Sequence, residues 1–162
     1  MPAAVTAPAV SVALEVPDPE AEIKRLQHKA NSHGKSGEPL KAANIAAEAV
    51  TISETIYGPE HPTTLDARRQ QLWWASEVFT QSCRSLSKQW DLFGKQRKKQ
   101  KRNATALRKS WETLIGSFQQ TYGRNHRETL QVRWWYADSI RKTCYREKDW
   151  TASSYIGKSW LT

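Results

Sequence analysis

The residues that could do chemistry begin with a segment spaced like a phosphate-binding loop. Residues 152–159 read ASSYIGKS, which fits the loose form of a loop whose backbone amides wrap around a phosphate. Such a loop follows a buried strand and opens a helix. Here residues 145–149 are polar or charged, and only three residues follow Ser159. A second GKS, at residues 34–36, lacks even the small residue upstream. We therefore expect no nucleotide site.

The histidines and cysteines do not form the clusters that metal or nucleophilic chemistry needs. They are spread along the chain as His28, His33, His61, His126, Cys83 and Cys144. Neither cysteine has a histidine close by or a CxxC partner. His61 and His126 lie inside a repeated segment, where we expect them to bond or pack at a helix junction. The sequence thus predicts no enzyme, no metal site and no cofactor.

An internal repeat indicates how the chain is organised. Residues 57–65 read YGPEHPTTL and residues 122–130 read YGRNHRETL, an offset of 65. The shared linker positions are Tyr57, Gly58, His61 and Leu65 in the first copy, and Tyr122, Gly123, His126 and Leu130 in the second. Apolar residues at helical spacing flank both copies. Gly permits the backbone turn after a helix, and Pro62 suits the first turn of the next. Each copy is predicted to end one helix and begin another.

The segment YGPEHPTTLDAR resembles the linker of the kinesin light chain-like class of tetratricopeptide repeats, where Gly-x-x-His-Pro-x-Thr-Leu joins one repeat to the next. The resemblance is specific at residues 54–68, readable at 120–137, and extends over roughly 18–162. It implies an all-α, right-handed solenoid of two to three helical hairpins that binds a protein or peptide in a groove. Two departures are Arg127 in place of the family's proline and a spacing longer than the family's.

A basic segment accounts for the long spacing. Residues 94–103 read GKQRKKQKRN, without an apolar residue, so we interpret them as an insertion, either a solvated loop or an exposed helical extension. Its cations are Lys95, Arg97, Lys98, Lys99, Lys101 and Arg102. Without the eight Lys and Arg residues of 95–109, the formal net charge would fall from +9 to +1. The segment is a solvated spacer, a nuclear-import or nucleic-acid patch, or a site for an acidic protein or membrane face.

Helical periodicity predicts seven helices, at about 19–32, 38–57, 62–80, 86–93, 104–121, 127–145 and from 149 onward. Adjacent tryptophans occur at 73–74 and at 134–135, and side chains next to each other on a helix point about 100° apart. One member of each pair therefore lies at the edge of the core or on a concave surface. Either both rings pack between stacked helices, or one of them is an aromatic anchor that faces a ligand. The predicted partner-binding residues, in a groove lined by the third and sixth helices, are Arg69, Gln70, Trp73, Trp74, Arg133, Trp134 and Arg141.

These features predict a non-catalytic protein–protein interaction scaffold that binds a protein or peptide partner. If that partner is acidic, the basic segment would attract it. The alternative is an RNA-associated or architectural subunit that contacts phosphates through residues 95–109.

We expect residues 1–17 to be a flexible tail, and we expect no membrane span. The expected location is intracellular, either cytoplasmic or nuclear. The apolar residues of the carboxyl end, Trp150, Tyr155, Ile156, Trp160 and Leu161, predict truncation, a constitutive partner or self-association through that end.

Overall fold

The computed structural model describes residues 18–86 and 94–144, and this part of the chain is helical without strands. The five helices are α1 (Pro19–Lys35), α2 (Pro39–Tyr57), α3 (Pro62–Leu86), α4 (Gly94–Tyr122) and α5 (Arg127–Cys144). The all-α prediction is confirmed. The predicted tail at 1–17 and the predicted helix after 149, with its self-association, lie outside the described residues.

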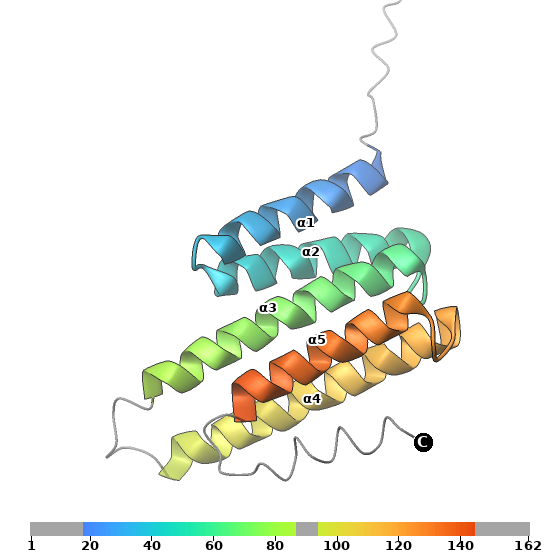
Figure 1. The fold of residues 1–162 in the computed structure, drawn as a ribbon. Coiled ribbons are helices and arrows are strands. Elements are labelled where there is room, and N and C mark those ends of the chain that lie inside the picture. Colours follow the sequence, from blue (N-terminus) through green and yellow to red (C-terminus); the bar gives the residue numbers. More distant parts are fainter. Residues whose placement is uncertain (1–17, 87–93, 145–162) are drawn as a thin grey trace, which may run out of the picture.

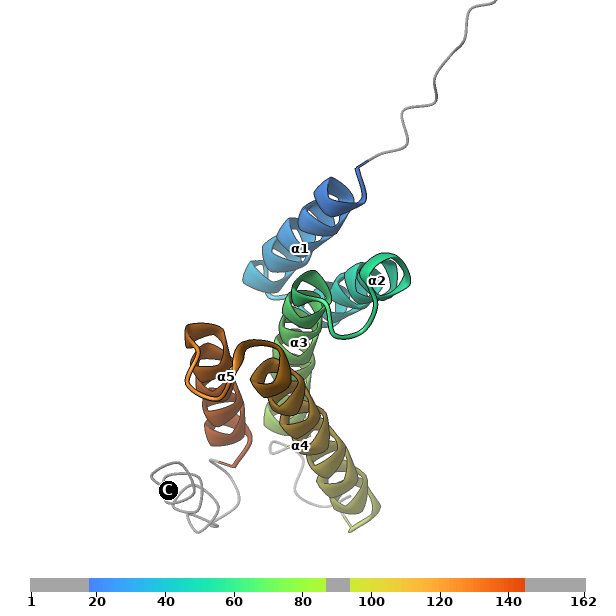
Figure 2. The ribbon, with the colours of Figure 1, turned by 90° about the vertical axis from the view of Figure 1, so that its right-hand side faces the viewer.

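The helices form an up-and-down array in which α3 contacts each of the other four (Figure 1). Each helix runs opposite to the one before it, so α1, α3 and α5 share one direction. Helices α2 and α5 lie on opposite sides of α3 (Figure 2). Contacts join α1 to α2, α4 to α5, and α3 to both α1 and α5. Alternate helices therefore meet, as well as consecutive ones.

Three helix boundaries differ from the sequence prediction. Helix α1 continues to Lys35, because the chain turns only at Gly37, whose φ is +82°. Helix α3 continues past residue 80 to Leu86, so the short helix predicted at 86–93 begins inside α3, and its remainder lies outside the described residues. Of the two forms considered for residues 94–103, the structure has the helical extension, continuous with α4. Lys, Arg and Gln favour helix, and no Pro interrupts them.

The core is divided between the two sides of α3. On one side, Leu65 packs with large side chains of α4 and α5, among them Trp111, Phe118, Val132 and Tyr136. On the other side, alanines of α2 let α1 and α3 approach closely, and Trp74 fills the space beside Ala42 and Ala46. The division places α3 at the centre, and among the described helices α5 contacts only α3 and α4.

Candidate functional site

The two repeated linkers adopt the same turn. Gly58 and Gly123 have φ of +85° and +94°, the region that a residue with a Cβ rarely adopts. The rings of Tyr57 and His61 stack with centroids 4.7 Å apart, and those of Tyr122 and His126 stack at 5.0 Å. Both linkers thus hold a stacked Tyr–His pair between two helices.

In each linker the histidine also caps the helix that follows. Nδ1 of His61 accepts a hydrogen bond from the backbone N–H of Thr63, and Nδ1 of His126 accepts one from Glu128, both at 3.3 Å. The first N–H groups of a helix have no partner inside it, so a side-chain acceptor stabilises the helix. The structure therefore places these histidines at helix junctions.

Replacing His126 with alanine is expected to lower the free energy of unfolding by about 1 kcal/mol, since it removes both the cap and the ring stack. Asparagine, whose side-chain oxygen can accept the same bond, should retain most of the stability. Urea unfolding followed by circular dichroism measures both variants. An alanine variant as stable as the wild type would contradict the capping role.

Arg69 and Gln70, both among the residues predicted to bind a partner, join α3 to its neighbours. The Arg69 guanidinium pairs with Asp66, lies 3.1 Å from a Glu128 carboxylate oxygen and stacks over Trp135 at 4.9 Å from the ring centroid. Its side chain is 14% exposed. The Gln70 amide donates to the backbone oxygen of Gln27 and to Asn31 Oδ1, both on α1. These contacts hold α1, α3 and α5 together.

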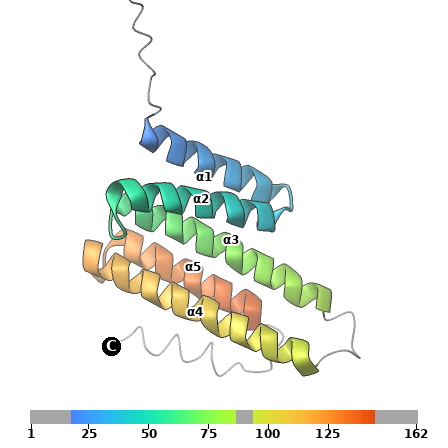
Figure 3. The same cartoon turned by 180° about the vertical axis from the view of Figure 1, so that it is seen from behind.

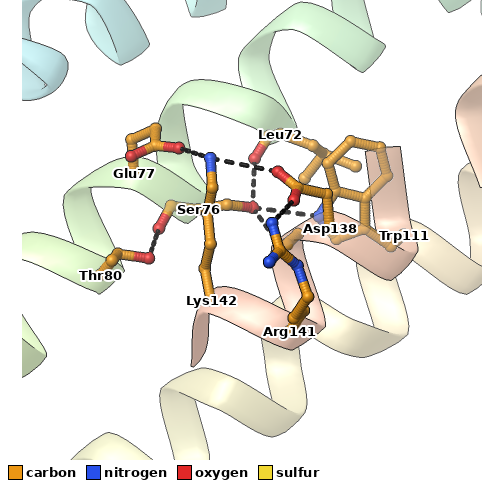
Figure 4. A network of polar contacts seen from close by, with 9 residues as sticks. Leu72, Ser76, Glu77, Thr80, Trp111, Asp138, Arg141 and Lys142 are labelled. Atoms are coloured by element: carbon orange, nitrogen blue, oxygen red, sulfur yellow. Dashed lines mark hydrogen bonds and ion pairs between the residues drawn. The ribbon is translucent and has the colours of Figure 1, made fainter. Parts of the chain in front are cut away.

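A buried polar network fixes the register of three helices (Figure 4). Ser76 Oγ on α3 accepts hydrogen bonds from Trp111 Nε1 on α4 at 3.1 Å and from Ser139 Oγ on α5 at 2.8 Å. It donates its own proton to the carbonyl of Leu72. Because every polar atom at this point has a partner, the network specifies one alignment of the helices.

Beside this network, the Lys142 ammonium on α5 forms ion pairs with Glu77 on α3 and with Asp138 on α5 (Figure 4). It lies 2.6 Å from a Glu77 oxygen, 3.1 Å from Asp138, and 4.4 Å from the centroid of the Trp73 ring. Burial opposes the charge of Lys142, but hydrogen bonds to Glu77 and Asp138 outweigh it and raise its pKa. Burial likewise opposes ionisation of Asp138, and hydrogen bonds from Arg141 and Lys142 lower its pKa.

Replacing Lys142 with methionine is expected to cost about 1–2 kcal/mol of stability at neutral pH, because the half-buried Glu77 loses its cation and Asp138 keeps only Arg141. The contribution is present in full between the ordinary pKa values of 3.8 for Asp138 and 10.5 for Lys142. It is lost as pH falls through the lowered pKa of Asp138 or rises through the raised pKa of Lys142. Urea unfolding from acid to alkaline pH measures this window. Lys41→Met, in an exposed pair, is the control with a smaller effect, and a pH-independent difference would contradict the account.

The four rings of the two tryptophan pairs differ in how far they are buried. Trp74 is buried, and Trp73 packs against Trp135 with ring centroids 5.2 Å apart. Trp134, by contrast, is 64% exposed. Both rings of the first pair therefore pack between helices, which is one of the two interpretations, whereas in the second pair Trp135 packs and Trp134 lies on the surface.

Trp134 belongs to a line of residues along the outer face of α5, here called the α5 stripe. The stripe consists of Arg127, Leu130, Trp134, Ala137 and Arg141. Shifted back by the 65-residue offset, it corresponds to the α3 stripe of Pro62, Leu65, Arg69, Leu72 and Ser76. Leu65 is 0% exposed and Leu130 is 49% exposed. From Leu65 to Ser76 the α3 stripe packs against α4 and α5, and only its first residue, Pro62, is exposed. In the α5 stripe Ala137 is half-buried, and the other four residues are exposed.

The structure brings two of the seven predicted partner-binding residues together on this surface, Trp134 and Arg141. The Arg141 side chain is 72% exposed and pairs with Asp138 at 2.7 Å. Arg133 lies beside the stripe, half-buried, with its pKa lowered first by burial and then by the nearby charge of Arg124. The stripe also contains Arg127 and Leu130, which are not among the residues predicted to bind a partner. The signal for them was the repeat itself, since Leu130 occupies the position of a buried leucine.

The basic segment forms the first part of α4, which extends past the end of α5 (Figure 3). Lys99, Lys101 and Arg102 are exposed there. The backbone of Lys95, Arg97 and Lys98 is helical, and their side chains lie outside the described residues. No acidic residue occupies the first turn of this helix. The exposed cations are separate from the α5 stripe in sequence and belong to another helix.

Within residues 18–86 and 94–144, no group of three or more His, Cys, Asp or Glu side chains converges on a metal position. None of the helices described combines the length and the apolar character that crossing a bilayer requires. Comparison with protein-family models finds none that matches the chain, and comparison with curated protein sequences finds no match either.

Proposed function

We propose that this chain is a non-catalytic protein-interaction module that binds its partner through the α5 stripe. The observation that supports the proposal is the contrast between equivalent positions: Leu65 is buried under neighbouring helices, and Leu130 and Trp134 are open to solvent. Burial of apolar surface contributes roughly 25 cal/mol per Å². Exposed Trp and Arg side chains are also the residues that most often dominate protein interfaces.

The proposal includes a tetratricopeptide-like arrangement of the helices. It is supported by the two matching linkers, by the alternating helix directions, and by the contacts of α3 with both α1 and α5. In stacked helical hairpins each repeat buries its apolar face against the next one. Helix α5 is the last helix of the described residues, and the face of it that no described helix covers is one that a partner can cover.

Capture of partners from a lysate of the source cells, with nuclease present, tests the proposal. Trp134→Ala is expected to weaken capture by about tenfold or more, since a central interface tryptophan contributes 2 kcal/mol or more. Ile56→Ala is the matched control, because Ile56 is 46% exposed on α2, away from the stripe. Equal losses for both variants, or for neither, would contradict binding through the stripe.

A second candidate function is binding of RNA phosphates by the exposed cations of α4. The specific observation is that Lys99, Lys101 and Arg102 project from one continuous helix whose first turn has no acid. Neutralising these three residues with glutamine is expected to reduce the slope of log K against log salt by roughly 2–3 for single-stranded RNA. A fluorescence-anisotropy titration at several salt concentrations measures the slope, and an unchanged slope would contradict this function.

A further inference from the structure

The spacing of the α5 stripe fits a helix as its binding partner. Its positions 127, 130, 134, 137 and 141 follow intervals of 3, 4, 3 and 4 residues. This is the spacing of the seam between two helices that cross at a shallow angle, and here it runs for roughly 21 Å. The equivalent stripe on α3 packs against helices from Leu65 to Ser76: Leu65 packs with residues of α4 and α5, and Ser76 bonds to both.

The stripe has an apolar centre and a cation at each end. Leu130 and Trp134 are the exposed apolar side chains in its middle. Arg127 is exposed at the amino-terminal end, and Arg141 at the carboxyl-terminal end. Asp138, beside Arg141, is 13% exposed and is held by Arg141 and Lys142, so it presents little charge to a partner. A helix that covered the whole stripe would meet positive charge at both ends.

This charge pattern disfavours a second copy of the chain on the stripe. In an antiparallel pairing centred on Trp134, Arg127 of one copy would face Arg141 of the other, because both are seven residues from the centre. In a parallel pairing each arginine would face itself. Like charges that face each other across such a seam oppose association. The complementary partner is a helix that carries carboxylates.

We propose that the α5 stripe binds a helix of another protein, apolar in its central turns and acidic at both ends. The inference rests on the proposed function, since it names the partner chemistry of the same surface. The apolar centre supplies affinity, and the two arginine–carboxylate pairs select the partner against helices with basic or neutral ends. The cations at 99, 101 and 102 are not needed for this selection.

Two synthetic helical peptides of about 21 residues test the inference by calorimetric titration against the full chain. They share one leucine- and alanine-lined seam and differ only in their ends, which carry glutamates in one peptide and lysines in the other. The acidic peptide is expected to bind about tenfold tighter. With Arg127→Gln and Arg141→Gln combined, the two affinities should become equal, and with both arginines changed to glutamate the preference should reverse. Circular dichroism confirms that each variant is folded.

A matched variant shows whether the preference for the acidic peptide comes from the α5 stripe or from the basic segment. Neutralising Lys99, Lys101 and Arg102 should leave the tenfold preference for the acidic peptide unchanged. The inference is overturned if that variant abolishes the preference, if the wild type binds both peptides equally, or if it binds neither. It is also overturned if Ile156→Asp is needed before any peptide binds, because the chain's own carboxyl-terminal residues would then be the occupant. The lysate capture with Trp134→Ala is independent of the peptides, so the proposed function can survive every one of these results except occupation of the stripe by the chain's own residues.

Discussion

Replacing Trp111 with alanine is expected to lower the free energy of unfolding by about 3–5 kcal/mol, the largest effect of any single change considered. Trp111 is 1% exposed and lies in the cluster that joins α3, α4 and α5. Its removal leaves a cavity beside Phe118 and Val132 and takes a hydrogen-bond donor from Ser76. Since whole domains are stable by only about 5–15 kcal/mol, the variant should unfold at much lower urea concentration.

The conservative variant Trp111→Phe separates the contribution of the buried ring from that of the hydrogen bond to Ser76. It keeps most of the buried ring but loses the Nε1–H group, so we expect a loss of about 1–2 kcal/mol. A double-mutant cycle with Ser76→Ala should give a coupling energy of roughly 0.5–1.5 kcal/mol. If Trp111→Ala cost less than Trp111→Phe, or if the coupling were zero, the network in Figure 4 would not hold these helices together.

Replacing Gly34 with alanine is expected to cost about 1–3 kcal/mol, although alanine is the better helix former. The added Cβ would overlap with the far edge of the Trp74 ring, which lies directly on Gly34. Trp74 cannot easily move, because it is buried among Ala30, Ala42 and Ala46. The strain must therefore push α1 away from α3 or force the ring into a poorer position.

Gly116→Ala is the matched control for this prediction. Gly116 also lies inside a helix, but a Cβ there would meet nothing within 4 Å. Alanine at this position should therefore stabilise the protein by about 0.5–1 kcal/mol. In thermal unfolding, Gly34→Ala should therefore be less stable than the wild type and Gly116→Ala more stable. A stabilised Gly34→Ala would show that Trp74 does not pack on α1 as described.

The elements could be predicted from the sequence where local signals were strong. The Tyr-Gly-x-x-His pattern places both helix junctions, because a Gly in the left-handed region and a following helix start are local properties of the chain. The form of residues 94–103 could not be predicted from composition. A segment without apolar residues has no periodicity, and helix propensity alone does not separate a solvated loop from an extended helix.

The site was harder to predict than the helices, because exposure depends on contacts distant in sequence. Arg69 carries the features of an interface residue, yet it is enclosed by Glu128 and Trp135 of α5. Likewise, Trp74 is buried because α2 offers small alanines opposite it. Trp134, in the same kind of pair, has no described helix in front of it. Only the three-dimensional arrangement distinguishes these two tryptophans.

Photo-crosslinking from position 134 shows whether the α5 stripe contacts another protein in the cell. A benzoylphenylalanine in place of Trp134 is irradiated in the source cells, and the same residue in place of Ile56 is the control. We predict one dominant adduct with another protein from position 134, on a segment with acidic ends and an apolar centre, and none from position 56. The absence of an adduct from 134, or the same adducts from both positions, would contradict a binding surface on α5.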